Sequence, residues 1–180
     1  MLWVSVVPAF GQSPTTDLRM AAGCGPTKER FEVKVNKAKH EITQPEPGKS
    51  LVYVIVQERP HPGEALYIGN ITTRVGADGK WLGANYGESH VSFALEPGEH
   101  RICSDWQSRV KSRQKLSGAA DLTVEPGKIY YFLLELVSGA PINGTNGSVF
   151  PEPELKLKAV DRSEGMLLVS KAGQSTWKAK

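Results

Sequence analysis

The chain is poor in the residues from which catalytic and metal sites are built. Its 180 residues include only two cysteines and four histidines, with no HxH, HExxH or CxxC pattern. It also lacks a GxSxG nucleophile elbow and a glycine loop of the kind that holds phosphates. We therefore expect no catalytic residues, no metal site and no cofactor, and we expect that the protein is not an enzyme.

The histidines are spaced too widely to share one ion. His90 and His100 flank a predicted hairpin. If Leu95 pairs with His100, then His90 lies five positions along the ladder, about 17 Å away at roughly 3.4 Å per residue. His40 and His61 lie in proline-rich connectors. A shared metal site is therefore not predicted.

Long apolar runs and a strong charge of one sign are also missing. Beyond its first residues the chain has nothing near the roughly 18 apolar residues that cross a bilayer, so no transmembrane segment is expected in the mature protein. The formal net charge is only +3, which does not indicate nucleic acid as a partner. The length suits one domain with its own core.

The N-terminus resembles the end of a secretory signal. Residues 2–10 form an apolar run, and Ala9 and Gly11 are the two small residues that a signal peptidase reads. The positively charged start is missing, so residues 1–11 are interpreted as a truncated signal peptide, with an apolar N-terminal strand as the alternative. We expect an exported protein, located in the periplasm, at the cell envelope or in the medium.

The two cysteines fit that compartment. Cys24 and Cys103 in an exported chain predict one disulfide, which closes a loop of about 80 residues. Two free buried thiols are one alternative. The other is a lipoprotein box over residues 20–24, in which Cys24 carries lipid, although the polar residues 15–19 stand where a hydrophobic region is needed.

The rest of the chain shows the patterns of strands. Phe31, Val33 and Val35 alternate with polar residues, while residues 51–56 are continuously apolar. Hairpins are expected where residues 71–75 meet 80–83, 91–95 meet 100–106 and 120–124 meet 129–134. Asp161 caps a short C-terminal helix. These features predict an all-β fold, a single antiparallel β-sandwich of Ig/transthyretin-like type with seven to eight strands.

The expected organisation has one folded unit. Residues 12–29 are interpreted as a flexible leader, residues 30–172 as the β-sandwich domain with a long loop over 138–153, and residues 173–180 as a polar tail.

Three copies of Glu-Pro-Gly punctuate this domain. They occupy residues 46–48, 96–98 and 125–127, each before a predicted strand. Proline fixes φ at the second position of a type II turn and glycine takes the positive φ that follows. We interpret them as joints of one fold with solvated acids, which need not converge on one site.

Four segments in order resemble the DUF2846 family. They are PGKSLVYVIV, TTRVGADGKWLGANYGESHVSFALEPGEHRICSDWQ, LTVEPGKIYYFLLEL and KAVDRSEGMLLVSK, which together span residues 47–171. A looser likeness to PEGA-type domains lies in the rhythm of turn, glycine and strand. The DUF2846 resemblance implies a bacterial envelope-associated β-domain of unknown function, and it carries over no site residues.

Two sets of residues are candidates for binding. Arg109, Lys111, Arg113 and Lys115 occur at every second position and would form a basic stripe on one face of a strand. Such a stripe fits anionic headgroups or polysaccharide, while the alternative is a charged edge strand that prevents aggregation.

The second set is Trp81, Tyr86 and Trp106, near the expected hairpins. Exposed, these rings would stack on sugars; buried, they belong to the core, and Trp106 shares the strand parity of Ile102. We expect a non-catalytic binding or structural module of the bacterial envelope, with a carbohydrate- or anionic-surface-binding module as the alternative. Envelope proteins, polysaccharide and the membrane surface are the candidate partners.

Overall fold

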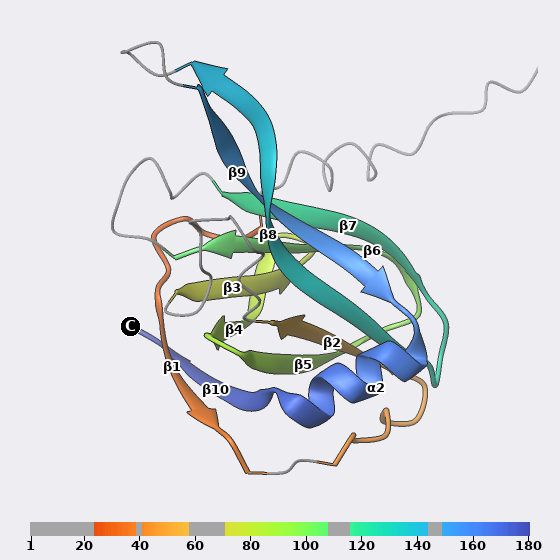
Figure 1. Cartoon of the computed structure of the whole chain (residues 1–180). Coiled ribbons are helices and arrows are strands. Elements are labelled where there is room, and N and C mark those ends of the chain that lie inside the picture. The colour runs from red at the N-terminus through yellow and green to blue at the C-terminus, as the bar shows by residue number, and fades with distance from the viewer. Residues whose placement is uncertain (1–23, 39–40, 58–70, 108–115, 144–148) are drawn as a thin grey trace, which may run out of the picture.

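The computed structural model describes residues 24–38, 41–57, 71–107, 116–143 and 149–180. Within these ranges the chain forms ten strands and one helix. The elements are β1 (Phe31–Asn36), β2 (Ser50–Val56), β3 (Thr72–Ala77), β4 (Lys80–Tyr86), β5 (Ser89–Leu95), β6 (Gly98–Trp106), β7 (Ser117–Val124), β8 (Ile129–Asn143), β9 (Val149–Val160), α2 (Arg162–Lys171) and β10 (Gly173–Ala179). They make a six-stranded sheet, β1-β10-β5-β2-β8-β9, and a four-stranded sheet, β4-β3-β6-β7 (Figure 1).

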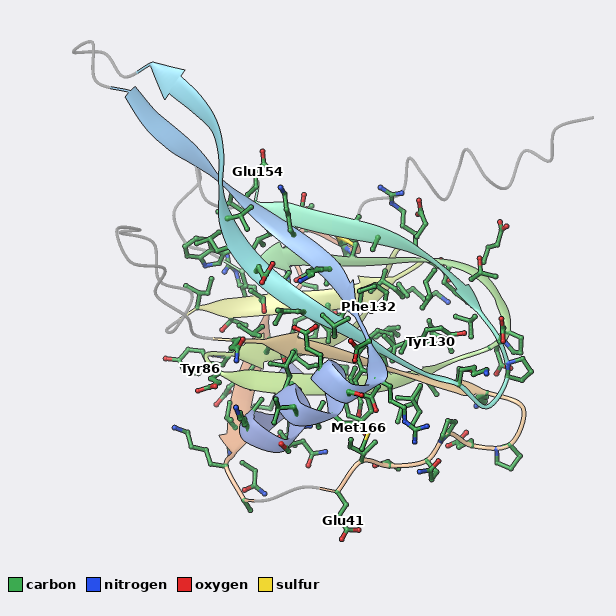
Figure 2. The ribbon with its side chains drawn as sticks, turned by 45° about the vertical axis from the view of Figure 1, so that its right-hand side comes forward. Glu41, Tyr86, Tyr130, Phe132, Glu154 and Met166 are labelled. Atoms are coloured by element: carbon green, nitrogen blue, oxygen red, sulfur yellow. A yellow bond between two sulfur atoms is a disulfide. The ribbon has the colours of Figure 1, made fainter. Side chains whose placement is uncertain are left out.

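The two sheets share one apolar core. Val54 of β2 and Phe132 of β8 face it from the six-stranded sheet, and Val75 and Ile102 face it from the other; all four are at most 2% exposed. Phe132 lies inside the molecule between the layers (Figure 2). The prediction of a mostly β chain with one short helix near its C-terminus is therefore confirmed.

Only one of the three predicted hairpins forms. β3 and β4 pair across Asp78 and Gly79, whose φ values of 51° and 82° suit the tight turn that matches strand twist. The hairpins predicted for β5 with β6 and for β7 with β8 are wrong, because in each case the two strands lie in different sheets. Turns of types I and II, in which proline is common at the first central position, splay the strands they join. The second and third Glu-Pro-Gly triplets therefore carry the chain from one sheet to the other.

The six-stranded sheet is mixed, whereas an antiparallel fold was predicted. β2 pairs with β8 in parallel, from Leu51 opposite Ile129 to Val56 opposite Leu134, and the start of β10 runs parallel to β5. Parallel neighbours need a long crossover. The passage of the chain through the four-stranded sheet between β2 and β8 supplies it.

Two segments predicted to be irregular are strands. Residues 138–153, expected as a loop, contain the ends of β8 and β9, which pair as far as Asn143 opposite Val149. These ends project from the body of the molecule as a two-stranded arm (Figure 1). The tail predicted for residues 173–180 is also wrong, because β10 pairs with β1 over all but its first residue, from Gln174 opposite Asn36 to Ala179 opposite Phe31.

Helix α2 covers the outer face of the six-stranded sheet. Asp161 caps it as predicted, since its carboxylate accepts a hydrogen bond from the Glu164 amide at 2.9 Å. Leu168 and Val169 pack on Tyr53 and Tyr131, whose rings stack at 5.5 Å. Burial raises the pKa of the Tyr131 phenol.

Gly165 allows this helix to approach the sheet. A Cβ at this position would overlap the ring of Tyr131. We therefore expect Gly165→Ala to destabilise the protein by about 1–3 kcal/mol through overpacking, although alanine normally stabilises a helix relative to glycine. Urea unfolding is the measurement, with Ser163→Ala on the exposed side of α2 as the control. A higher unfolding midpoint for Gly165→Ala would show that the helix does not sit against Tyr131.

Candidate functional site

The predicted disulfide is present and lies on the outer face of the four-stranded sheet. Cys24 and Cys103 are joined with their Cα atoms 5.4 Å apart. Cys103 follows Ile102, which faces the core, so its side chain points outward as the strand parity predicts. Its cross-strand partner is Gly76, where a Cβ would lie 2.7 Å from the Cys24 carbonyl oxygen. The chain from Cys24 to Arg30 is thereby strapped across this face; below, residues 24–30 are called the strap.

A buried ion pair holds the same strap. Arg74 of β3 lies opposite Asp105 of β6, and its Nε donates to Asp105 Oδ1 at 2.6 Å while Nη2 donates to Oδ2. Nη1 donates to the carbonyl oxygens of Thr27 and Glu29 in the strap. Burial raises the pKa of the Asp105 carboxyl, and the adjacent guanidinium offsets part of that rise. The pair thus joins two strands to the N-terminal segment.

Trp81 packs against Arg74 and the strap, and it is therefore not part of an exposed surface on which sugars could stack. Its ring is buried, with the Arg74 guanidinium 4.4 Å from its centroid. Its Nε1 donates to the Pro26 carbonyl oxygen at 3.0 Å, and a Cβ at Gly25 would lie 2.6 Å from the ring. Residues 24–29 are therefore held against the domain, and the prediction of a flexible leader is wrong for them; residues 1–23 lie outside the described part.

The other predicted binding residues do not assemble either. Trp106 is buried in the shared core, as its parity with Ile102 indicates. Tyr86 is 42% exposed at the end of β4 (Figure 2). The three aromatics therefore form no common exposed surface. The basic stripe of Arg109, Lys111, Arg113 and Lys115 falls in residues 108–115, outside the described residues.

The two described histidines have different surroundings. His90 is buried, with its ring 5.7 Å from that of Tyr53. His100 lies between two turns: Nδ1 is 2.6 Å from Asp78 Oδ2 and Nε2 is 2.8 Å from the Glu96 carbonyl oxygen. Asp78 also accepts a hydrogen bond from the Arg101 amide. His100 is thus part of the packing between the β3–β4 turn and the second Glu-Pro-Gly triplet.

Metal ligands do not gather in the part of the chain that the structure describes: it has no group of three or more His, Cys, Asp or Glu side chains suited to hold an ion. His40 and His61 fall outside that part. Among the same residues no helix is long and apolar enough to span a membrane.

The three Glu-Pro-Gly triplets meet at one end of the molecule. The Gly127 amide donates to the Lys49 carbonyl oxygen at 2.8 Å, and Lys49 Nζ lies 3.1 Å from Glu46 and 3.8 Å from Glu96. Glu46 and Glu96 are both about 70% exposed, so their acids are solvated as predicted. The contact between the three turns was not predicted from the sequence. It forms because all three turns lead into a strand at the same end of the molecule.

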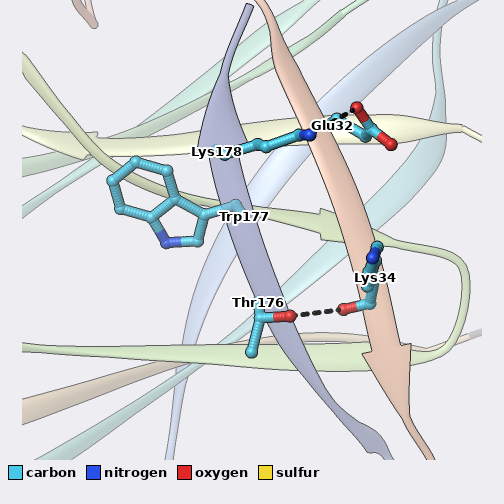
Figure 3. Close-up of a pocket in the computed structure, with 5 residues that line it drawn as sticks. All are labelled: Glu32, Lys34, Thr176, Trp177 and Lys178. Atoms are coloured by element: carbon cyan, nitrogen blue, oxygen red, sulfur yellow. Dashed lines mark hydrogen bonds and ion pairs between the residues drawn. The ribbon is translucent and has the colours of Figure 1, made fainter.

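An exposed tryptophan that was not among the predicted site residues marks a further surface. Trp177 of β10 is 40% exposed and lines a pocket of about 170 Å³ together with Glu32, Lys34, Thr176 and Lys178. β1 and β10 place these residues side by side, since Glu32 pairs with Lys178 and Lys34 with Thr176. Figure 3 shows the indole on one side of β10, with Lys178 reaching toward Glu32 on the other.

Neighbouring side chains fix the orientation of the Trp177 ring. The ring of Phe31 meets it edge to face, with centroids 5.2 Å apart at 86°. On its other side a Cβ at Gly83 would lie 3.2 Å from Nε1. On the opposite face of the strand pair, Lys178 Nζ is 3.4 Å from Glu32, and Thr176 Oγ1 donates to the Lys34 carbonyl oxygen at 3.4 Å. The alternation of Ser175, Trp177 and Ala179 with polar residues is the period-two signal that would have revealed this strand.

A comparison of the chain with models of known protein families, with curated proteins and with solved structures found no match. The resemblance to DUF2846 therefore stays a prediction.

Proposed function

We propose that the chain is a non-catalytic binding or structural module of the bacterial cell envelope, a β-sandwich of Ig/transthyretin-like type related to DUF2846 that works after export. The observation that carries this proposal is the Cys24–Cys103 disulfide. Disulfides persist in oxidising compartments and are rare in the cytosol. The bond joins Cys24 of the strap to β6, an inner strand of the four-stranded sheet, which suits a domain exposed to an oxidising exterior.

The hydrogen-bond partners of the buried polar side chains support a binding or structural role for the module. Arg74 and Asp105 bind each other, and Arg74 also donates to a carbonyl oxygen of the strap. His100 is placed between Asp78 and the Glu96 carbonyl. A catalytic dyad presents its second ring nitrogen to a nucleophile, whereas here that nitrogen faces a backbone carbonyl of a turn.

A second candidate is binding of carbohydrate or of an anionic surface. The exposed ring of Trp177 and, on the opposite face of the β1–β10 pair, the lysines Lys34 and Lys178 favour this function, and Tyr86 adds a separate exposed ring. The basic stripe from Arg109 to Lys115 stays a prediction with the same chemistry.

Co-sedimentation tests the envelope role. The purified full chain, with its disulfide formed, is mixed with isolated cell-wall sacculi and separately with membrane vesicles of anionic lipid. With one of these fractions, we expect several-fold more of this chain in the pellet than of an unrelated basic protein of the same size. Protein that stays in every supernatant at low and at physiological salt would contradict the envelope role.

A further inference from the structure

We propose that the outer edge of β1 binds an extended acidic segment of another protein as an added antiparallel strand. In this mode of recognition a peptide pairs its main chain with the edge of a sheet, and its side chains at alternate positions give specificity. The inference rests on the binding role proposed above and names the class of partner. β1 is the last strand of the six-stranded sheet and lies at its outer margin (Figure 1).

The hydrogen bonds of β1 show which main-chain groups face this edge. The Phe31 amide donates to Gln107 Oε1 at 2.6 Å, and Gln107 Nε2 donates to the Phe31 carbonyl oxygen at 2.9 Å, so these groups of Phe31 point away from β10. Main-chain groups alternate in direction along an antiparallel strand. The groups of Val33 and Val35 therefore face the edge too, where they have no partner among the residues that the structure describes.

The Gln107 side chain limits the site at one end. Its carboxamide takes the place beside Phe31 that a residue of a further strand would occupy. At the other end β1 stops at Asn36. The open edge thus presents the N–H and C=O groups of Val33 and Val35, which are a template for a short extended segment.

The outward-facing charges select an acidic segment. Lys34, Lys178 and Lys180 share the outer face of the β1–β10 pair with one carboxylate, Glu32, which lies 3.4 Å from Lys178 and 3.9 Å from Lys180. Lys34 is exposed and makes no ion pair with the described residues. Opposite charges that face each other across two strands attract. An acidic side chain opposite Lys34 in the added strand therefore supplies the partner that this lysine lacks.

The inner face of the same strand suits apolar side chains. Val33 and Val35 are half-buried and lie on the face that carries Phe31 and Trp177. Apolar residues opposite the two valines would cover the part of them that water still reaches. The preferred segment therefore has the pattern apolar, acidic, apolar.

A second copy of this chain is a poorer occupant of the edge. If two β1 strands pair through Val33 and Val35, Lys34 lies opposite the Lys34 of the second copy, and like charges in that position repel. The register that brings Glu32 opposite Lys34 places Val35 opposite Phe31, whose main-chain groups Gln107 already holds. The charges thus favour a different, acidic chain.

The test is an NMR titration of the isotope-labelled, disulfide-bonded full chain with the capped peptide Thr-Val-Glu-Val-Thr. In the free chain, we expect the Val33 and Val35 amides to exchange with solvent about ten-fold faster than the Phe31 amide, which Gln107 holds. The peptide should shift both valine signals and slow their exchange about ten-fold. Lysine in place of the glutamate should weaken binding about five-fold.

N-methylated peptides separate main-chain pairing from other contacts. A methyl group on either valine nitrogen removes a donor that faces β1 in the antiparallel arrangement, so it should weaken binding about ten-fold. A methyl group on the glutamate nitrogen, which faces away from β1, is the matched control and should leave binding unchanged. These peptides leave the folding of the protein untouched.

Protein variants test the same edge from the other side. Val33→Pro removes a donor that faces the edge and none that faces β10, so the domain should stay folded while peptide binding falls about ten-fold. Lys34→Gln should weaken binding about two- to five-fold. Lys156→Gln removes an exposed lysine of β9 and should have no effect.

Four results would overturn the inference. Val33 and Val35 amides that are already protected in the free chain would show that another part of the chain covers the edge. A chain that sediments as a dimer, and as a monomer with Val33→Pro, would show that a second copy occupies it. Equal binding of the glutamate and lysine peptides would exclude an acidic partner. Equal binding of the peptides methylated at valine and at glutamate would exclude antiparallel strand addition.

The sedimentation assay separates failure of this inference from failure of the proposed function. If the parent chain and Val33→Pro both pellet with an envelope fraction while no peptide binds, the edge site is wrong and the envelope role stands. If neither protein pellets with any fraction, the envelope role itself fails.

Discussion

Arg74→Ala is expected to lower the free energy of unfolding by about 3–5 kcal/mol, the usual cost of removing one partner of a buried ion pair. Arg74 and Asp105 are 7% and 13% exposed at their side chains, so the carboxylate left behind is shielded from water. The substitution also removes the donors to Thr27 and Glu29 and the cation above Trp81. Urea unfolding at pH 7, with the disulfide intact, is the measurement.

The loss in Arg74→Ala should depend on pH. Without the guanidinium, burial raises the pKa of Asp105 in the folded state above its value in the unfolded chain. A raised carboxyl pKa means that stability is lost as pH rises through the folded value and is regained in acid. The difference from the parent protein should therefore be smaller at pH 4 than at pH 7. A difference that grows in acid would show that Asp105 is not the buried partner of Arg74.

A double-mutant cycle supplies the control for this pair. Arg74→Ala with Asp105→Ala together should cost less than the sum of the two single changes, because no uncompensated charge stays buried. Arg101 and Asp121 form a matched exposed pair at 2.9 Å. Arg101→Ala should cost only about 0.2–1 kcal/mol. Equal losses for Arg74→Ala and Arg101→Ala would contradict the burial of the first pair.

Removal of the disulfide is expected to cost about 4–5 kcal/mol, the chain-entropy value for a closed loop of this length. The bond spans 79 positions from Cys24 to Cys103. Cys103→Ser and the double variant with Cys24→Ser should lose the same amount, because the loop opens once. The parent protein in reductant should unfold at the same urea concentration as the double variant. Parent protein that is insensitive to reductant would contradict the bond.

The Cys24–Cys103 disulfide and the Arg74–Asp105 ion pair both hold the strap, so the losses of stability caused by removing them should not add. Arg74 holds the carbonyl oxygens of Thr27 and Glu29, three and five residues after the cysteine that the disulfide fixes. Once the strap is released by loss of either interaction, the remaining one contributes less to the free energy of unfolding. The triple variant with both serines and Arg74→Ala should therefore lose less than the two separate losses combined. Simple additivity would indicate that the strap is not their common target.

The elements of the fold were largely predictable because their signals are local. The alternation from Phe31, the apolar run of β2, the Asp78-Gly79 turn and the cap at Asp161 each depend on residues within one element, and the structure has all four. Strand parity also predicted that Trp106 faces the core together with Ile102. The candidate site was missed, because its alternation at Trp177 was assigned to a polar tail.

The sequence by itself determined where the strands before residue 138 lie, where the Asp78-Gly79 turn lies and which two cysteines meet, since period-two patterning and turn chemistry act over a few residues. Only the tertiary structure decided which strands pair. β5 and β6 are consecutive yet lie in opposite sheets, while β1 and β10, from opposite ends of the described chain, are neighbours. Pairing depends on how whole faces bury against each other, and the surface at Trp177 exists only because that burial joins β1 to β10.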